Sequence, residues 1–287
     1  MSFRPVDKVL LGYVAITSGV AAARLPGNHA CAWVLLANAL VVLLAILVNR
    51  PALGPVGRAL ADLYPLPVMV GCYAALDILA AHGGIAPHDA AVQRWEAAVF
   101  GGQPSREWWQ RAPSRFLSTM LHAAYLSYYA IVPAGPVWFL LRGERRSLER
   151  AVLAVITAYV VCYLAFILFP VAGPYYAFPR PAAWFLDNAP ARLVYRLLAG
   201  GSSFGAAFPS SHVAAAVAAT IAAAAGSRRL GLVLAVPTAL LAIAVVYCQM
   251  HYAVDAASGL AVGGIVAAGV VGRGRSGQRV EGVASSE

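Results

Sequence analysis

Long runs of apolar residues alternate with short polar connections along the whole chain. A helix that crosses a membrane needs about 20 predominantly apolar residues, because each residue adds only about 1.5 Å. The pattern therefore predicts an all-α fold, a polytopic transmembrane helix bundle of about eight spans, with boundaries near 9–24, 29–49, 65–82, 116–141, 150–169, 211–226, 230–248 and 252–272.

The first apolar run has a second interpretation. Lys8, the apolar stretch after it and the alanines before Arg24 also fit a signal peptide. We favour a retained span, because the second run follows after only a short RLPGNH turn. Without the first run, seven spans would remain with the same topology.

Composition supports an integral membrane protein and excludes several other classes. The chain is 61% hydrophobic and 11% charged, so a water-soluble globule would expose too much apolar surface. A net charge of +9 does not indicate nucleic acid here, because the arginines lie in loops between apolar runs and set topology. The four cysteines lie inside apolar runs without metal-ligand spacing, which predicts neither disulfides nor zinc.

The basic residues also predict the orientation of the spans. Thirteen lie on the side of the two termini and eight on the other side, and seven of those eight fall in the long connections 83–115 and 170–210. Long connections carry little weight in the positive-inside rule, so the termini are expected in the cytoplasm and both connections on the outer face. The arginine-rich and alanine-rich usage is typical of GC-rich bacteria, which indicates a bacterial inner (plasma) membrane.

The chain is predicted to hold one transmembrane domain, residues 1–272, followed by a polar, disordered tail at 273–287. The first part, 1–149, holds the N-terminal spans and a tryptophan-rich connection suited to the membrane interface. The second part, 150–272, holds the candidate chemistry and forms the catalytic half.

The first candidate site element is FPSSH, at the outer end of the sixth span. Serine is a good N-cap, so a helix should begin at Ser210 or Ser211 and direct its first amides and its positive dipole end outward, as an anion site. His212, in the same turn, could donate a proton to a bound anion. An isolated SSH is more typical of a capped helix with an interfacial histidine, so the surrounding residues must decide.

The second element is HYAVD, at the start of the eighth span. His251 and Asp255 are four residues apart, which places both on one face of a helix. A carboxylate bonded to one ring nitrogen leaves the other nitrogen free as nucleophile or base. A structural histidine–aspartate pair is equally typical of this spacing alone, but an acid in an apolar span is costly and usually functional.

The third element is Arg180, held between two prolines and able to present its guanidinium group to phosphate oxygens. A loop arginine alone is usually only solvated. Three such groups at outward helix ends together predict a phosphoryl-transfer site that uses no metal and no cofactor.

These motifs resemble the type 2 phosphatidic acid phosphatase superfamily of membrane lipid phosphatases and phosphotransferases. The motif 209–212 is similar to the family's Pro-Ser-Gly-His, and His251 with Asp255 match its third signature; the style of FPSSH and HY is closest to inositol phosphorylceramide synthases. The resemblance covers about residues 150–272 and implies a catalytic core of the six-helix type. By resemblance, His251 attacks phosphorus, Asp255 orients it, His212 protonates the leaving alcohol, and Ser210 and Ser211 hold the phosphate.

The resemblance also implies the partners: a lipid or polyprenyl phosphate substrate, the surrounding membrane lipids and, for a transferase, an alcohol acceptor. Two signature cations are missing, since Gly173 stands where the family has lysine and Val245 where it has arginine. A monoester dianion needs more positive charge than a diester, so phosphatase and phosphotransferase both stay open.

Weaker candidates for substrate contact are Gln249, Tyr176 and Asp77. Tyr176 is more typical of an interfacial anchor, and Asp77 could instead pair within the bundle. The rival interpretation is a transporter or structural membrane protein with a polar His/Asp cluster. The predicted location of the cluster at helix ends argues against it, because transporter sites tend to lie near the membrane midplane.

Overall fold

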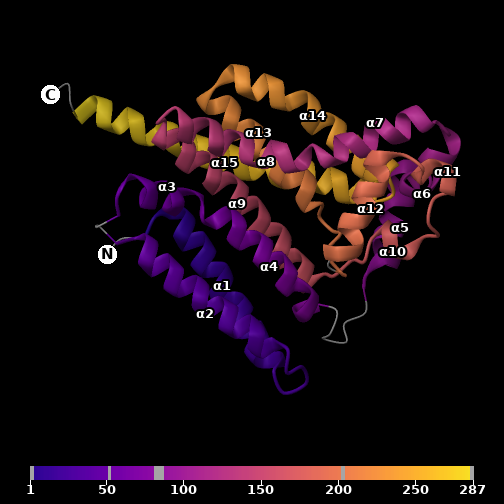
Figure 1. Ribbon diagram of the computed structural model, residues 1–287, viewed down its shortest axis with the longest axis horizontal. Coiled ribbons are helices and arrows are strands. Elements are labelled where there is room, and N and C mark those ends of the chain that lie inside the picture. Colours follow the sequence, from indigo (N-terminus) through magenta and orange to yellow (C-terminus); the bar gives the residue numbers. More distant parts are fainter. Residues whose placement is uncertain (1–2, 51–52, 81–86, 202–203, 285–287) are drawn as a thin grey trace.

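The computed structural model describes residues 3–50, 53–80, 87–201 and 204–284, and these residues form an all-α bundle (Figure 1). Within them the β pairing is limited to one isolated bridge between Val171 and Ala206. The helices are α1 (Pro5–Arg24), α2 (Cys31–Val48), α3 (Pro55–Leu63), α4 (Pro65–Ala80), α5 (Asp89–Phe100), α6 (Pro104–Arg111), α7 (Arg115–Leu126), α8 (Tyr128–Leu141), α9 (Arg145–Leu168), α10 (Pro174–Ala177), α11 (Ala183–Leu186), α12 (Ala189–Gly201), α13 (Ser211–Gly226), α14 (Arg228–Tyr247) and α15 (Ala253–Ala284).

Seven helical segments are long and apolar enough to cross a membrane, which confirms the predicted fold class. They correspond to seven of the eight predicted spans. The remaining span is α13, whose bounds agree with the prediction but which has only 16 residues. The segment is short because it ends in Gly226 and a new N-cap, Ser227, begins α14 directly afterwards.

Helix α13 lies at the centre of the bundle, packed against α8, α9, α14 and α15. Its buried face consists largely of alanines, which let neighbouring helices approach closely. On α15, a Cβ atom added at Gly259 would lie 2.6 Å from the Ser210 carbonyl oxygen, and one added at Gly263 would lie 2.4 Å from the Ala214 carbonyl oxygen. These two glycines therefore set the distance between α13 and α15, at the level where the site begins.

The short helices of the two long connections gather at one end of the bundle. In Figure 1, α5, α6, α10, α11 and α12 lie together at the right, whereas α3 and both termini lie at the left. The connections thus share one end, as the apolar pattern predicts, and the outward ends of α9, α13 and α15 meet there.

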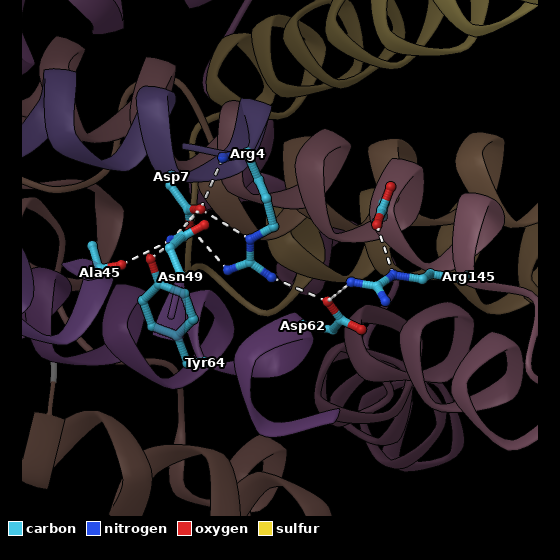
Figure 2. A network of polar contacts seen from close by, with 8 residues as sticks. Arg4, Asp7, Ala45, Asn49, Asp62, Tyr64 and Arg145 are labelled. Carbon is cyan, nitrogen blue, oxygen red and sulfur yellow. Dashed lines mark hydrogen bonds and ion pairs between the residues drawn. The ribbon is translucent and has the colours of Figure 1, made fainter. Parts of the chain in front are cut away.

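A network of polar contacts joins α1, α2, α3 and α9 near the N-terminus (Figure 2). The buried Asp7 carboxylate accepts hydrogen bonds from Arg4, Asn49 and the Tyr64 hydroxyl. Arg4 also pairs with Asp62, at 3.0 Å. Because each buried charge has several partners, the network fastens the N-terminal hairpin to the rest of the bundle.

Two details differ from the sequence prediction. The fourth span is divided at Ser127 into α7 and α8, and two prolines lie inside α8. The final helix continues through Ala284, where a disordered tail was expected; that stretch has no proline to end the helix. Residues 81–86, at the junction of the third span and the first long connection, lie outside the described residues.

Candidate functional site

Two histidines from different helix ends lie side by side at the end of the bundle that carries the connections. The ring centroids of His212 and His251 are 5.7 Å apart. Both rings line a small cavity of about 40 Å³, together with Tyr175 and Tyr176. A single water needs about 10–15 Å³ measured in this way, so the cavity has room for a small polar group.

The start of α13 forms as its sequence predicts. Ser210 is the N-cap, and its hydroxyl accepts a hydrogen bond from the Val213 amide at 3.4 Å. Its own amide donates to the Asp255 carbonyl at 3.0 Å, so Ser210 is occupied by structural contacts. The amides of Ser211 and His212 are the first two of the helix and have no intrahelical partner, which makes them the better anion donors.

The spacing of His251 and Asp255 had suggested that both lie on one helix. His251 instead lies in the turn between α14 and α15. Gln249 adopts a left-handed conformation (φ 60°), and the amides of Met250 and His251 both donate to the Val245 carbonyl at 2.9 Å. This closure resembles the usual left-handed end of a helix, with glutamine in place of the common glycine. It brings His251 back toward α13.

The hydrogen bonds of His251 fix which ring nitrogen carries the proton. Its Nδ1 lies 3.0 Å from the Ala207 carbonyl, which can only accept, so Nδ1 is protonated and Nε2 keeps its lone pair. Burial lowers the pKa of His251 to about 4. The ring is therefore neutral near pH 7 and suited to act as a nucleophile or base.

Asp255 lies close to His251 but is not its nearest partner. The Asp255 carboxylate is 3.5 Å from Nδ1 of His251, and the same oxygen accepts the Tyr252 amide at 2.8 Å. Its other oxygen is buried and has no partner among the described residues. Through its side chain and its carbonyl, Asp255 holds together the turn before α15 and the start of α13.

His212 lies in an aromatic environment that the sequence did not reveal. Its Nε2 is 3.2 Å from the Tyr125 hydroxyl, and its ring centroid is 4.5 Å from that of Tyr128. These tyrosines come from α7 and α8. Nδ1 of His212 is buried and has no partner in the described part of the chain, so it is available to a bound ligand.

The other predicted site residues differ in how they relate to the small cavity between the two histidines. Arg180 is exposed and donates to the Tyr175 hydroxyl at 3.1 Å, so it stands beside the lining of the small cavity. Gln249 is buried and donates to the Pro179 carbonyl at 2.9 Å, which ties the loop of Arg180 to the His251 turn. Tyr176 lines the cavity, whereas Asp77 on α4 is not among the described lining residues.

The two missing cations have a structural reason. Gly173, at the lysine position, has a positive φ of 91°, and a Cβ atom there would lie 2.9 Å from Cβ of Ala207. Val245, at the arginine position, is buried in the bundle. The left-handed backbone at Gly173 and the close approach of Ala207 therefore disfavour a lysine at this position.

Helix α5 supplies three polar residues that sequence reasoning missed. Asp89, Gln93 and Glu96 have the spacing of one helix face. Asp89 accepts the amides of Ala172 and Gly173, each at 2.8 Å. These contacts hold the loop that follows α9.

The same face of α5 also holds the turn that carries His251. The Tyr252 hydroxyl donates to Asp89 at 2.9 Å and accepts from Gln93, while Glu96 accepts the Ala253 amide at 2.7 Å. Burial raises the pKa of Glu96 to about 7. The DxxxQxxE spacing was a readable signal, although the loops that it contacts could not be identified from it.

The fold and this pair of histidines define a polytopic membrane protein with a candidate site at one end of its bundle. Residues 90–269 match the PAP2 superfamily, and the chain belongs to that superfamily. The match begins at residue 90 and not near 150, so it includes Gln93 and Glu96 of α5, whereas Asp89 lies just before it. No curated protein and no solved structure matches the chain at a significant level.

This membership gives the chain a phosphatase or phosphotransferase function in general terms. Together with the seven apolar segments, it also identifies an integral membrane protein. It does not single out the inositol phosphorylceramide synthase branch.

Proposed function

We propose that the chain transfers the phosphoryl group of a lipid or polyprenyl phosphate through a phosphohistidine at His251. The observation that carries this proposal is the pairing of a neutral His251, with its Nδ1 proton donated to Ala207, and His212, 5.7 Å away across the same small cavity. Nε2 of His251 then has the free lone pair that a nucleophile needs.

The reaction proceeds in two balanced steps. When the anionic substrate is bound, His212 carries a proton on both ring nitrogens. Nε2 of His251 attacks phosphorus, the bond from phosphorus to the ester oxygen breaks, and the protonated His212 gives a proton to the leaving alcohol. Water, or the hydroxyl of an acceptor alcohol, then attacks phosphorus; it gives its proton to His212, and the N–P bond breaks. The amides of Ser211 and His212 and the guanidinium of Arg180 stabilise the phosphoryl oxygens.

Asp255 acts as a positioning residue in this scheme. It holds the turn of His251 through the Tyr252 amide and stands 3.5 Å from Nδ1, close enough to stabilise positive charge on the ring during attack. By the positive-inside rule the termini lie in the cytoplasm and the site lies on the outer face, in the inner membrane of a bacterium.

The test uses the full chain in lipid nanodiscs with a panel of ³²P-labelled lipid and polyprenyl phosphates. We expect His251→Ala to abolish turnover and His29→Ala, an exposed histidine in the α1–α2 connection, to leave it unchanged. Turnover should also survive a metal chelator. Full activity of His251→Ala would overturn the proposal.

The same assay separates the two reaction types. A phosphatase releases labelled inorganic phosphate, whereas a phosphotransferase moves the label to an added alcohol such as inositol or glycerol. A transporter would instead show substrate-dependent proton flux in vesicles without any phosphate chemistry; the position of both histidines at helix ends disfavours that function.

A further inference from the structure

A second, larger cavity of about 380 Å³ adjoins the small one. His212, Tyr73, Tyr125 and Leu198 line both cavities, so the two meet around His212. The large cavity extends from this point between α4, α8, α9 and α12. Whatever occupies it is therefore continuous with a group held at the two histidines.

The walls of the large cavity are apolar in character. Aliphatic side chains such as Leu66, Val132 and Leu197 alternate with tyrosine rings. Several tyrosine hydroxyls are used within the protein: Tyr128 is hydrogen-bonded to Tyr159, and Tyr125 is hydrogen-bonded to His212. Ring faces are left to contact a ligand, which favours an apolar occupant over a polar one.

The cavity reaches the outer surface of the bundle. Three of its lining residues are well exposed there: Val70 on α4 is 70% exposed, Tyr129 on α8 is 54% exposed and Leu197 on α12 is 43% exposed. In an integral membrane protein, such apolar surface faces lipid chains. An apolar chain can therefore pass from the bilayer into the cavity sideways, between α4, α8 and α12.

The volume is sufficient for a hydrocarbon chain. A single water needs about 10–15 Å³ measured in this way, and the large cavity has about 380 Å³. Because the cavity opens at the surface of the bundle, the remainder of a longer lipid can stay in the bilayer.

We propose that this cavity binds an apolar chain that enters between α4, α8 and α12, the tail of the phosphate ester whose head group lies between His212 and His251. This inference rests on the proposed function for the identity of the head group. One wall of the cavity is formed by α4, which supplies Leu66, Met69 and Val70 and precedes the family region at 90–269. Helix α4 thus contributes to the choice of lipids that the family core can accept.

Photolabelling tests the cavity independently of turnover. The probe is dodecyl phosphate with a diazirine at the far end of the chain, added to the full chain in phosphatidylcholine nanodiscs and mapped by peptide mass spectrometry. We expect labelling concentrated in residues 66–73 and 128–133 and prevented by unlabelled dodecyl phosphate. Equal labelling of all lipid-facing helices, or labelling that dodecyl phosphate does not prevent, would overturn the proposal.

A matched pair of variants makes the test sharper. Val70→Trp should reduce the labelling at least fivefold, because the indole fills the opening. Val233→Trp, at a valine of α14 that is 68% exposed and outside the described lining, should leave the labelling unchanged. Leu197→Trp narrows the opposite wall and should repeat the loss; unchanged labelling in both cavity variants contradicts the assignment.

The two proposals fail in different ways. If the wild type shows specific, competed labelling of α4 but releases or transfers no phosphate from dodecyl phosphate or from the lipid panel, the cavity assignment stands and the proposed function fails. If dodecyl phosphate is turned over but the label is spread over the whole lipid-facing surface, the proposed function stands and the cavity assignment fails.

Discussion

The contact between α13 and α15 gives a sharp prediction, because two adjacent glycines of α15 differ completely in their surroundings. A Cβ atom added at Gly263 would lie 2.4 Å from the Ala214 carbonyl and 2.8 Å from Cβ of Val217. The carbonyl belongs to the backbone of α13, so the helices themselves must move apart. At Gly264 the same atom meets nothing within 4 Å.

The magnitudes follow from these distances. Overpacking a close contact costs about 1–3 kcal/mol, so Gly263→Ala should destabilise the bundle by that amount. Gly264→Ala should gain up to about 1 kcal/mol, because alanine is the better helix former. For a chain of this size 1 kcal/mol corresponds to about 2–4 °C, so the melting temperatures of the two variants should differ by roughly 10 °C.

The assay is thermal unfolding of both purified variants in one detergent, followed by intrinsic fluorescence, with size-exclusion chromatography before and after heating. Wild type should melt between the two variants. Equal melting temperatures, or a Gly263→Ala variant more stable than wild type, would refute the close approach of α13 and α15. Such a result would also undermine the placement of His212, which begins on α13.

Three further predictions concern residues around the site. Burial raises the pKa of Glu96 to about 7, above its value in the unfolded chain. The stability that Glu96 contributes is therefore full at low pH and is lost as pH rises through about 7. Glu96→Gln should flatten this fall in melting temperature between about pH 5 and pH 8. Asp89→Ala leaves two loop amides and a tyrosine hydroxyl without their acceptor. We therefore expect the free energy of unfolding to fall by about 1–3 kcal/mol and kcat to fall at least tenfold. Wild-type values of both quantities would contradict the role assigned to α5. Tyr125→Phe removes the hydrogen bond to His212 and should lower kcat about three- to tenfold; a wild-type kcat in this variant would contradict a role for that bond.

Local signals in the sequence predicted the start of α13 and the apolar spans. Ser210 caps the helix because capping depends only on neighbouring residues, and each span depends only on its own run of apolar positions. The division at Ser127 was not predictable from hydropathy, since the residues on both sides are equally apolar.

The partners of the histidines depend on tertiary structure and could not be predicted. The Ala207 carbonyl reaches His251 because the strand-like pairing of Val171 with 205–207 holds it there. The spacing of His251 and Asp255 suggested a direct bond on a helix, but the left-handed turn at Gln249 places His251 before α15. Similarly, the spacing of Asp89, Gln93 and Glu96 in the sequence indicates a polar face on α5, but it does not identify the two loops that this face contacts.

The most direct test of the central claim is the identity of the phosphorylated atom. Wild-type protein mixed with ³²P-labelled substrate should be quenched within milliseconds under alkaline denaturing conditions, which preserve phosphohistidine, and the labelled peptide located by mass spectrometry. The account predicts a phosphoryl group on His251 that is absent from His251→Ala. A label on another residue, or steady turnover by His251→Ala, would contradict the account.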